Sequence, residues 1–201
     1  ALKTKKQKNK TVYYVNFAME KNALDTRAAR YSIFVEKYAA KFGIDKSLVY
    51  AIIEAESSFN PYAVSHIPAY GLMQIVPTTA GIDSMAHVKG VKKIPSKDYL
   101  FDPQNNIELG TGYLNLLKTK YLKGISHPLS HEYCIISAYN TGAGNVLRTF
   151  DSNKNTAVSK INRYSPQKLY KKLISDLPYA ETRRYLQKVT QKKKKFIIYE
   201  G

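Results

Sequence analysis

The chain contains 201 residues, 44% of them hydrophobic, and carries a formal net charge of +17 at pH 7. This composition predicts a soluble globular chain with one sizeable core, organised as one main domain with short additions. No segment approaches the roughly 18 consecutive apolar residues of a membrane-spanning helix, and the first ten residues, five of them lysines, lack the apolar segment of a signal peptide. The single cysteine, Cys134, excludes an internal disulfide, and its apolar neighbours predict a buried thiol rather than a nucleophile.

The positive charge indicates a polyanionic partner or an acidic environment. The lysines are scattered, apart from the runs at 3–10 and 192–195, and charge runs at termini are most often solvated tails. No nucleic-acid-binding module is readable, so we expect no nucleic-acid partner. A cell-wall glycan with acidic peptides, or a lipid headgroup surface, would satisfy the same electrostatics, and the charge alone does not choose between them.

The first predicted element is a short strand over residues 11–18, in which Tyr13, Val15 and Phe17 alternate with the residues between them. The apolar run at 196–199 is its candidate partner, and the two would form a short β ribbon from the terminal segments. From residue 27 the pattern becomes helical and continues until Gly43, which ends the helix. The rest of the chain reads as helices, so we expect a mainly α fold.

A second helix, capped by Asp45, carries the most informative residue. Glu56 lies four residues after Ile52 and three after Ile53, on the apolar stripe of this helix, whereas Glu54 lies on the opposite side and is predicted to face water. A carboxyl against apolar surroundings has a raised pKa and can donate a proton near neutrality, as a general acid must. The alternative, which spacing leaves open, is that Glu56 bends back to solvent or pairs with a lysine or arginine.

Four further helices are predicted downstream. Asp102 and the proline after it begin a long helix, Ser130 is the candidate cap of a helix through residue 138, and Ser165-Pro166 and Leu177-Pro178 each begin another. Residues 81–101 lack clean periodicity and are expected to form a long loop or short helices over the core.

These elements carry motifs that resemble, in the same order, those of the lytic transglycosylases. The likeness covers roughly residues 30–189 and rests on the following residues: Glu56-Ser-Ser-Phe-Asn-Pro61, Ser65, Gly71-Leu-Met-Gln74, Asn106-Ile107 with Gly110 and Tyr113-Leu114, Ala138-Tyr-Asn140 with Gly142 and Gly144, and Glu181-Thr-Arg-Arg-Tyr185. The resemblance implies a lysozyme-like helical domain that cleaves peptidoglycan glycan strands between N-acetylmuramic acid and N-acetylglucosamine.

In that family one glutamic acid, here Glu56, protonates the glycosidic oxygen and then removes the proton from the muramoyl C6 hydroxyl, which closes onto C1 to give a 1,6-anhydro sugar. Most glycosidases use two carboxyl groups, and no second one is evident beside the motif. A distant aspartate, such as Asp83, Asp98 or Asp102, remains an alternative.

The resemblance also implies the residues that bind the glycan. Ser65 would hydrogen-bond near the acid and the acetamido group, and Tyr185 would hydrogen-bond Glu56. The remaining predicted substrate-binding residues are Met73, Gln74, Tyr139, Asn140 and Glu181. Without the motifs, Ser65 would read as a turn cap, Met73 as core packing and Glu181 as a partner of Arg184.

Two departures from the family pattern, Tyr70 and the spacer His66-Ile-Pro68, are expected to alter the shape of the sugar subsites rather than the chemistry. The four histidines offer no metal-ligand pattern, and the glycines at 142 and 144 lack the third glycine of a dinucleotide loop. We therefore expect no metal and no cofactor.

The predicted organisation has three parts: a basic segment with a short strand over 1–29, the remnant of an upstream region; the transglycosylase domain over 30–190; and a basic tail with a candidate strand over 191–201. We expect a periplasmic monomer, associated with the outer membrane through a lipid anchor absent from this sequence. Two alternatives stay open: a hydrolytic muramidase of goose-type lysozyme character, and a noncatalytic peptidoglycan-binding module.

Overall fold

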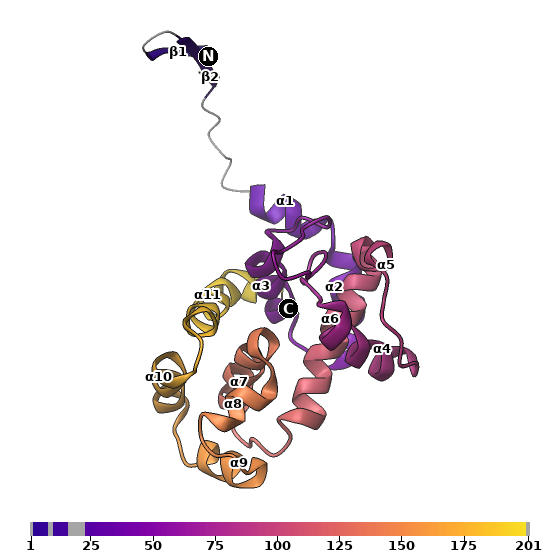
Figure 1. Ribbon diagram of the computed structural model, residues 1–201, viewed down its shortest axis with the longest axis vertical. Coiled ribbons are helices and arrows are strands. Elements are labelled where there is room, and N and C mark those ends of the chain that lie inside the picture. The colour runs from indigo at the N-terminus through magenta and orange to yellow at the C-terminus, as the bar shows by residue number, and fades with distance from the viewer. Residues whose placement is uncertain (1, 8–9, 16–22, 200–201) are drawn as a thin grey trace. The chain divides into compact units, whose positions relative to one another are not determined.

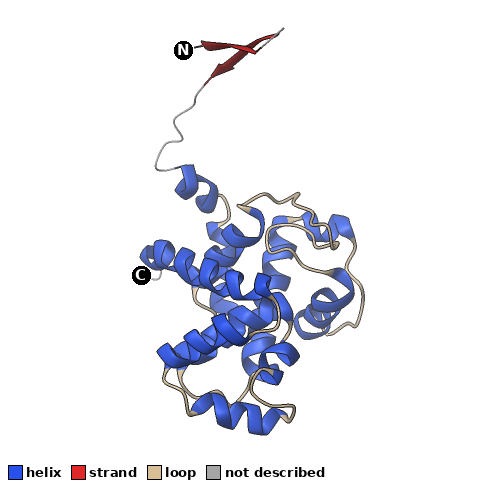
Figure 2. Cartoon of the chain, turned by 60° about the vertical axis from the view of Figure 1, so that its left-hand side comes forward, coloured by secondary structure: helices blue, strands red, loops and turns tan. Residues whose placement is uncertain are grey.

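The computed structural model describes residues 2–7, 10–15 and 23–199 (Figure 1). Contacts divide the chain into two compact units, Ala1–Arg30 and Tyr31–Gly201. The first unit contains the antiparallel strands β1 (Leu2–Gln7) and β2 (Lys10–Val15), with Leu2 opposite Val15 and Gln7 opposite Lys10, and the helix α1 (Ala23–Ala29). In the described part of the chain, Figure 2 shows strands in this unit and helices throughout the second.

The predicted strand near the N-terminus is confirmed as β2, but its predicted partner is wrong; residues 16–18 of the prediction lie outside the described residues. β2 pairs with β1, while Phe196 ends the last helix and Ile197–Tyr199 forms a 3-10 helix, η3. Phe196 is fully buried and stacks on Tyr50 with ring centroids 5.4 Å apart. It lies seven residues after the buried Val189, which is the repeat of a helical face. The terminal ribbon and the candidate strand in the 191–201 tail are therefore not formed, whereas the mainly α prediction is confirmed.

The second unit is built from helices. They are α2 (Ser32–Phe42), α3 (Lys46–Ser57), α4 (Ile82–Lys89), α5 (Lys97–Phe101), α6 (Pro103–Leu116), α7 (Pro128–Thr141), α8 (Ala143–Arg148), α9 (Lys154–Asn162), α10 (Pro166–Asp176) and α11 (Ala180–Phe196), with π-helical turns η1 (Pro77–Gly81) and η2 (Leu117–Tyr121). Helix α3 packs chiefly against α11 and α2. None of the described helices is both long and apolar enough to cross a membrane.

Local sequence signals explain most of the helix boundaries. Asp102 accepts a hydrogen bond from the backbone N–H of Asn105 at the start of α6, and Ser165 does the same for Lys168 at the start of α10; a proline follows each cap. The prediction that Ser130 caps α7 is wrong, because His127 takes that place with its ring Nδ1. Residues 81–101 contain the short helices α4 and α5, one of the two predicted outcomes.

Helix α3 is packed on more than one side, and α11 lies along it (Figure 1). This packing overturns the prediction that Glu54 faces water. Glu54 is only 6% exposed, and its Oε1 accepts hydrogen bonds from Lys192 at 2.5 Å and Lys195 at 3.4 Å, both on α11. The polar side of α3 is thus the interface with a helix about 130 residues later in the sequence, which periodicity within α3 cannot reveal.

Candidate active site

Glu56 lies in the last turn of α3 and lines a pocket. Its pKa is raised from 4.5 to about 7, chiefly because burial disfavours the carboxylate. Glu181, at the start of α11, raises this pKa further through its negative charge. Among the described residues Glu181 forms no ion pair, so the alternative of a pairing with Arg184 is not seen. A carboxyl with a pKa of about 7 can both give and accept a proton at neutral pH, as acid–base catalysis requires.

Two residues of α11 lower the pKa of Glu56. Tyr185 is buried at 7% exposure and interacts with the Glu56 carboxyl as a hydrogen-bond partner, yet its hydroxyl forms no well-aligned hydrogen bond in the described structure. The contact between Tyr185 and Glu56 is therefore a loose one. The ammonium of Lys188 donates to the carbonyl oxygen of Ala55 at 2.5 Å, next to Glu56, and its positive charge favours the carboxylate.

Replacing Lys188 by methionine should raise the pKa of Glu56, because the nearby positive charge is lost while most of the side-chain volume remains. In a pH profile of kcat/KM, the limb on which Glu56 loses its proton should move to higher pH. Lys188→Arg should leave this limb in place, and so should Lys194→Met, which removes an exposed lysine of the same helix. An unchanged limb in Lys188→Met would contradict the role assigned to the lysine.

The pocket that contains Glu56 has a volume of about 430 Å³. It is lined by Glu56, Ser65, Ile67, Ala69, Gln74, Val76, Tyr139, Asn140, Thr141, Asn145, Tyr179, Glu181 and Thr182. We call it the Glu56 pocket. The structure thus brings together in this pocket six of the eight residues predicted from the sequence. A seventh, Tyr185 of α11, contacts Glu56 without lining the pocket. Met73 is the exception, since its side chain is fully buried and does not line the pocket.

Hydrogen bonds within the protein limit what these side chains can offer a ligand. The Gln74 amide nitrogen donates to the carbonyl oxygens of Ala63 (3.0 Å) and Gly71 (2.9 Å), so its Oε1 is left as an acceptor. The Tyr139 hydroxyl donates to the carbonyl of Met73 at 2.8 Å. The proton of the Tyr139 hydroxyl is therefore already used within the protein.

Ser65 lines the Glu56 pocket but also organises the loop that follows it. Its Oγ accepts a hydrogen bond from the backbone N–H of Ala69 at 3.2 Å and donates to the carbonyl of Ile67. This is the turn-cap arrangement, and it holds Ile67, a residue of the unusual spacer, in the pocket wall. The other departure, Tyr70, does not line this pocket and packs edge-on against Phe101, with ring centroids 5.8 Å apart.

The turn that carries Gln74 depends on Asn106, a buried residue of α6. Its Oδ1 accepts from the backbone N–H of Met73 at 2.8 Å, and its Nδ2 donates to the carbonyls of Tyr70 (2.9 Å) and Leu100 (2.7 Å). Gly71, with φ of +78°, leaves the space that this amide occupies: a Cβ there would lie 2.3 Å from Asn106 Nδ2. The family motif included Asn106, but its role as the brace of this turn was not predicted.

The Glu56 pocket continues into two others. One shares Gln74, Val76, Tyr139, Asn140 and Thr141 with it and extends to Tyr113 and Gly142; the other shares Asn145 and Tyr179 and extends to Arg148 and Asp176. We call the three together the groove. A groove of several adjoining pockets suits a ligand with repeating units, such as a polymer strand, better than a single small molecule.

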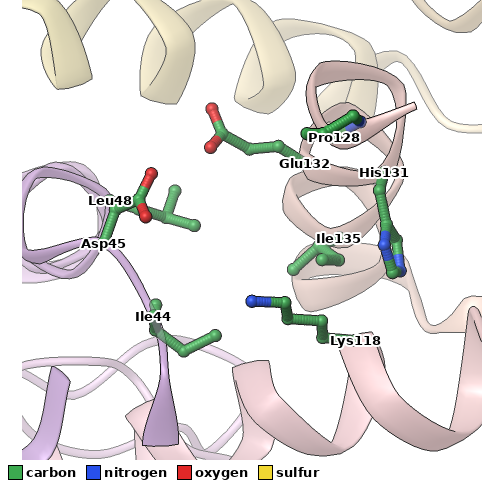
Figure 3. Close-up of a pocket in the computed structure, with 8 residues that line it drawn as sticks. All are labelled: Ile44, Asp45, Leu48, Lys118, Pro128, His131, Glu132 and Ile135. Atoms are coloured by element: carbon green, nitrogen blue, oxygen red, sulfur yellow. The ribbon is translucent and has the colours of Figure 1, made fainter. Parts of the chain in front are cut away.

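A separate pocket lies at the other end of α3 (Figure 3). Figure 3 shows the ammonium of Lys118 across this pocket from the carboxylates of Asp45 and Glu132. These two carboxylates are bridged by Lys193 of α11, at 2.8 Å and 2.6 Å. None of the residues predicted to act on a glycan lines it, so the Glu56 pocket and this one are distinct sites.

Comparisons with known proteins agree with this geometry. Residues 33–162 match the family described as Transglycosylase SLT domain. Membrane-bound lytic murein transglycosylase C of Haemophilus influenzae is 47% identical over 192 residues, 96% of this chain and 54% of that protein. The namesake of Cronobacter sakazakii is 47% identical over 195 residues, 97% of this chain and 54% of that protein. The chain thus spans about half the length of the curated relatives it matches.

Solved structures show the same fold. The 70-kDa soluble lytic transglycosylase SLT70 of Escherichia coli superposes with a TM-score of 0.63 and 25% identity, over 85% of this chain and 24% of SLT70. The complex of a 70-kDa soluble lytic transglycosylase with bulgecin A gives 0.65 and 26%, over 89% of this chain and 26% of that one. The fold is that of a lysozyme-like helical domain with an acidic side chain in a groove. The chain belongs to the SLT transglycosylase family.

Proposed function

We propose that this chain is a lytic transglycosylase domain that cleaves the glycan strands of peptidoglycan between N-acetylmuramic acid and N-acetylglucosamine. The observation that carries the proposal is Glu56: a carboxyl in the groove whose pKa of about 7 suits both the donation and the removal of a proton. Family membership supports the same reaction, and the relatives' names refer to murein.

The proposed reaction uses Glu56 twice. Protonated Glu56 gives its proton to the glycosidic oxygen, and the leaving sugar departs as the bond to C1 breaks. Glu56 is then a carboxylate and takes the proton of the muramoyl C6 hydroxyl while that oxygen bonds to C1, which returns Glu56 to its starting state. Water is not consumed, and the product ends in a 1,6-anhydro ring. The acceptor oxygen of Gln74 and the donor group of Asn140 would bind the sugars.

The rival function is hydrolysis, and Glu181 is the observation that favours it. Hydrolytic glycosidases use a second carboxyl group, and Glu181 is the other carboxyl residue that lines the Glu56 pocket. The three aspartates considered from the sequence do not line it: Asp83 accepts from Tyr121 at 2.9 Å, Asp102 caps α6 and Asp98 is exposed. Membership of the SLT transglycosylase family favours transglycosylation over hydrolysis.

Digestion of purified peptidoglycan tests the proposal. We expect new glycan ends that are anhydromuramoyl residues, one water lighter in mass spectrometry than the reducing ends left by hydrolysis. Reducing muramic acid as the main product would establish the rival function. Absence of any soluble fragment, with the protein still sedimenting with the sacculi, would instead establish a noncatalytic wall-binding module.

The setting of the whole protein is proposed by analogy. The relatives are named as membrane-bound, and peptidoglycan lies outside the cytoplasm, so we propose a periplasmic protein held at the outer membrane by a lipid anchor. We propose that residues 30–190 carry the catalytic function and that the domain acts as a monomer on glycan strands. Fractionation of cells that express the full-length protein would test the location.

A further inference from the structure

Thr182 is a buried polar residue in the first turn of α11, between Glu181 and the arginines of the family motif. It is 1% exposed, yet it lines the Glu56 pocket. Its Oγ1 donates a hydrogen bond of 2.7 Å to Oδ1 of Asn140, which belongs to α7. The bond therefore joins two helices whose residues are 42 positions apart in the sequence.

This bond determines whether the Asn140 amide offers the groove its donor nitrogen or its acceptor oxygen. An amide has one acceptor oxygen and one donor nitrogen, and exchanging them turns the group round without changing its shape. With Oδ1 accepting from Thr182, Nδ2 is left to donate. If the threonine hydroxyl were absent, nothing would hold the oxygen on that side, and the amide could present either group to a ligand.

In Gln74, which lines the same pocket, the amide nitrogen rather than the amide oxygen is bound within the protein. Both donor hydrogens of its amide nitrogen are directed to backbone carbonyls, so its oxygen is left to accept. The two amides therefore offer a ligand one acceptor and one donor. Internal hydrogen bonds fix each choice before a ligand arrives, and such preorganisation lowers the cost of binding.

We propose that Thr182 is a positioning residue that locks Asn140 as a hydrogen-bond donor to a substrate oxygen in the groove. This inference rests on the proposed function and deepens it, because it assigns the donor side of sugar recognition to a pair of residues on α7 and α11. Thr182 acts through Asn140 and not on the sugar itself, so its contribution exists only while Asn140 is present.

A double-mutant cycle tests this dependence. The proteins are wild type, Thr182→Val, Thr182→Ser, Asn140→Ala and the double variant Thr182→Val with Asn140→Ala. Valine matches threonine in shape but removes the hydroxyl, whereas serine retains it. We expect Thr182→Val to lower kcat/KM on a murein glycan oligomer roughly tenfold, the scale of one neutral hydrogen bond, Thr182→Ser to stay near wild type, and the double variant to equal Asn140→Ala.

Other outcomes separate this role from a structural one. One such outcome is that Thr182→Val lowers kcat/KM by the same factor in the Asn140→Ala background as in the wild type. That result would show that the threonine acts independently of the amide and would overturn the proposal. Full activity of Thr182→Val would overturn it as well. Thermal unfolding of all five proteins checks that each is folded.

The same five proteins are also titrated calorimetrically with an N-acetylglucosamine tetramer, which gives dissociation constants without any cleavage. In one result the wild type cleaves nothing while the dissociation constants still show coupling between Thr182→Val and Asn140→Ala. That result would contradict the proposed function but support the positioning role of Thr182. The opposite result is cleavage by the wild type, equal tetramer affinity of wild type and Thr182→Val, and no coupling between the two substitutions in kcat/KM. That result would contradict the role of Thr182 and leave the proposed function intact.

Discussion

Glu56→Gln is expected to lower the rate of glycan cleavage by at least roughly 10³-fold. General acid–base catalysis contributes about 10²–10⁴-fold for one group, and here the same carboxyl is proposed to act in both halves of the reaction. Glutamine retains the shape of the side chain but can neither donate nor accept the proton. The measurement is the initial rate of release of soluble fragments from purified peptidoglycan, with binding followed by co-sedimentation.

Glu36→Gln is the matched control, because it makes the same change at an exposed position of α2 and should leave the rate unchanged. If Glu56→Gln still binds peptidoglycan, the substitution has removed the catalytic step and left the groove intact. A rate for Glu56→Gln within a factor of ten of the wild type would remove Glu56 from the mechanism.

The stability of the same variant reports the cost of burying this carboxyl. Because the pKa of Glu56 in the folded chain, about 7, lies above its ordinary value of 4.5, the native state binds more protons than the unfolded state between these two values. Stability therefore falls as the pH rises through that window. At about 1.4 kcal/mol per unit, the cost above pH 7 is up to about 3 kcal/mol. Glu56→Gln should therefore be more stable than the wild type at pH 8, and this difference should vanish at pH 4.

Asn106→Ala is expected to lower the free energy of unfolding by about 3 kcal/mol or more. It would leave the N–H of Met73 and the carbonyl of Leu100 buried without their present partner, and each such loss costs about 1–3 kcal/mol. The carbonyl of Tyr70 would also lose Asn106 but would keep the N–H of Ile75. Because Tyr70 and Met73 belong to the turn that carries Gln74, activity should fall as well. Urea denaturation gives the change in free energy.

The neighbouring Asn105→Ala is the control for this prediction. Asn105 contributes its backbone N–H to the cap of α6, which the substitution retains, and its side chain is partly exposed. It should change the stability by no more than about 0.5 kcal/mol. Equal stability of Asn106→Ala and the wild type would show that the hydrogen bonds of Asn106 do not stabilise the turn.

The sequence predicted the elements whose signals are local. The stripe from Leu48 to Glu56 placed Glu56 toward the interior, and the caps at Asp102 and Ser165 placed two helix starts. The main failures involve contacts with distant parts of the chain. Glu54 lies on the polar side of α3 by periodicity, but α11 covers that side and supplies its lysine partners. The strand expected at 196–199 is absent because Phe196 ends α11 and stacks on Tyr50 of α3, and the next three residues form a 3-10 helix.

The sequence named residues for the candidate site but did not predict their hydrogen bonds. The motifs named Gln74 and Asn140, but nothing in a linear pattern specifies which end of an amide faces a ligand. That choice is set by the backbone carbonyls of Ala63 and Gly71 for one residue and by Thr182 for the other. A linear pattern also does not separate backbone from side chain: Met73 has its side chain in the core, while its backbone hydrogen-bonds to Asn106 and Tyr139.

The most direct test of the account is the fate of water during cleavage. A defined murein oligomer is digested by the wild-type chain in water enriched in ¹⁸O, and the new glycan ends are weighed by mass spectrometry. We predict anhydromuramoyl ends that contain no ¹⁸O, because the C6 hydroxyl of the substrate supplies the attacking oxygen. Incorporation of one ¹⁸O at each new muramoyl end would contradict the account, since it would show that water attacks C1 and that the groove hydrolyses its substrate.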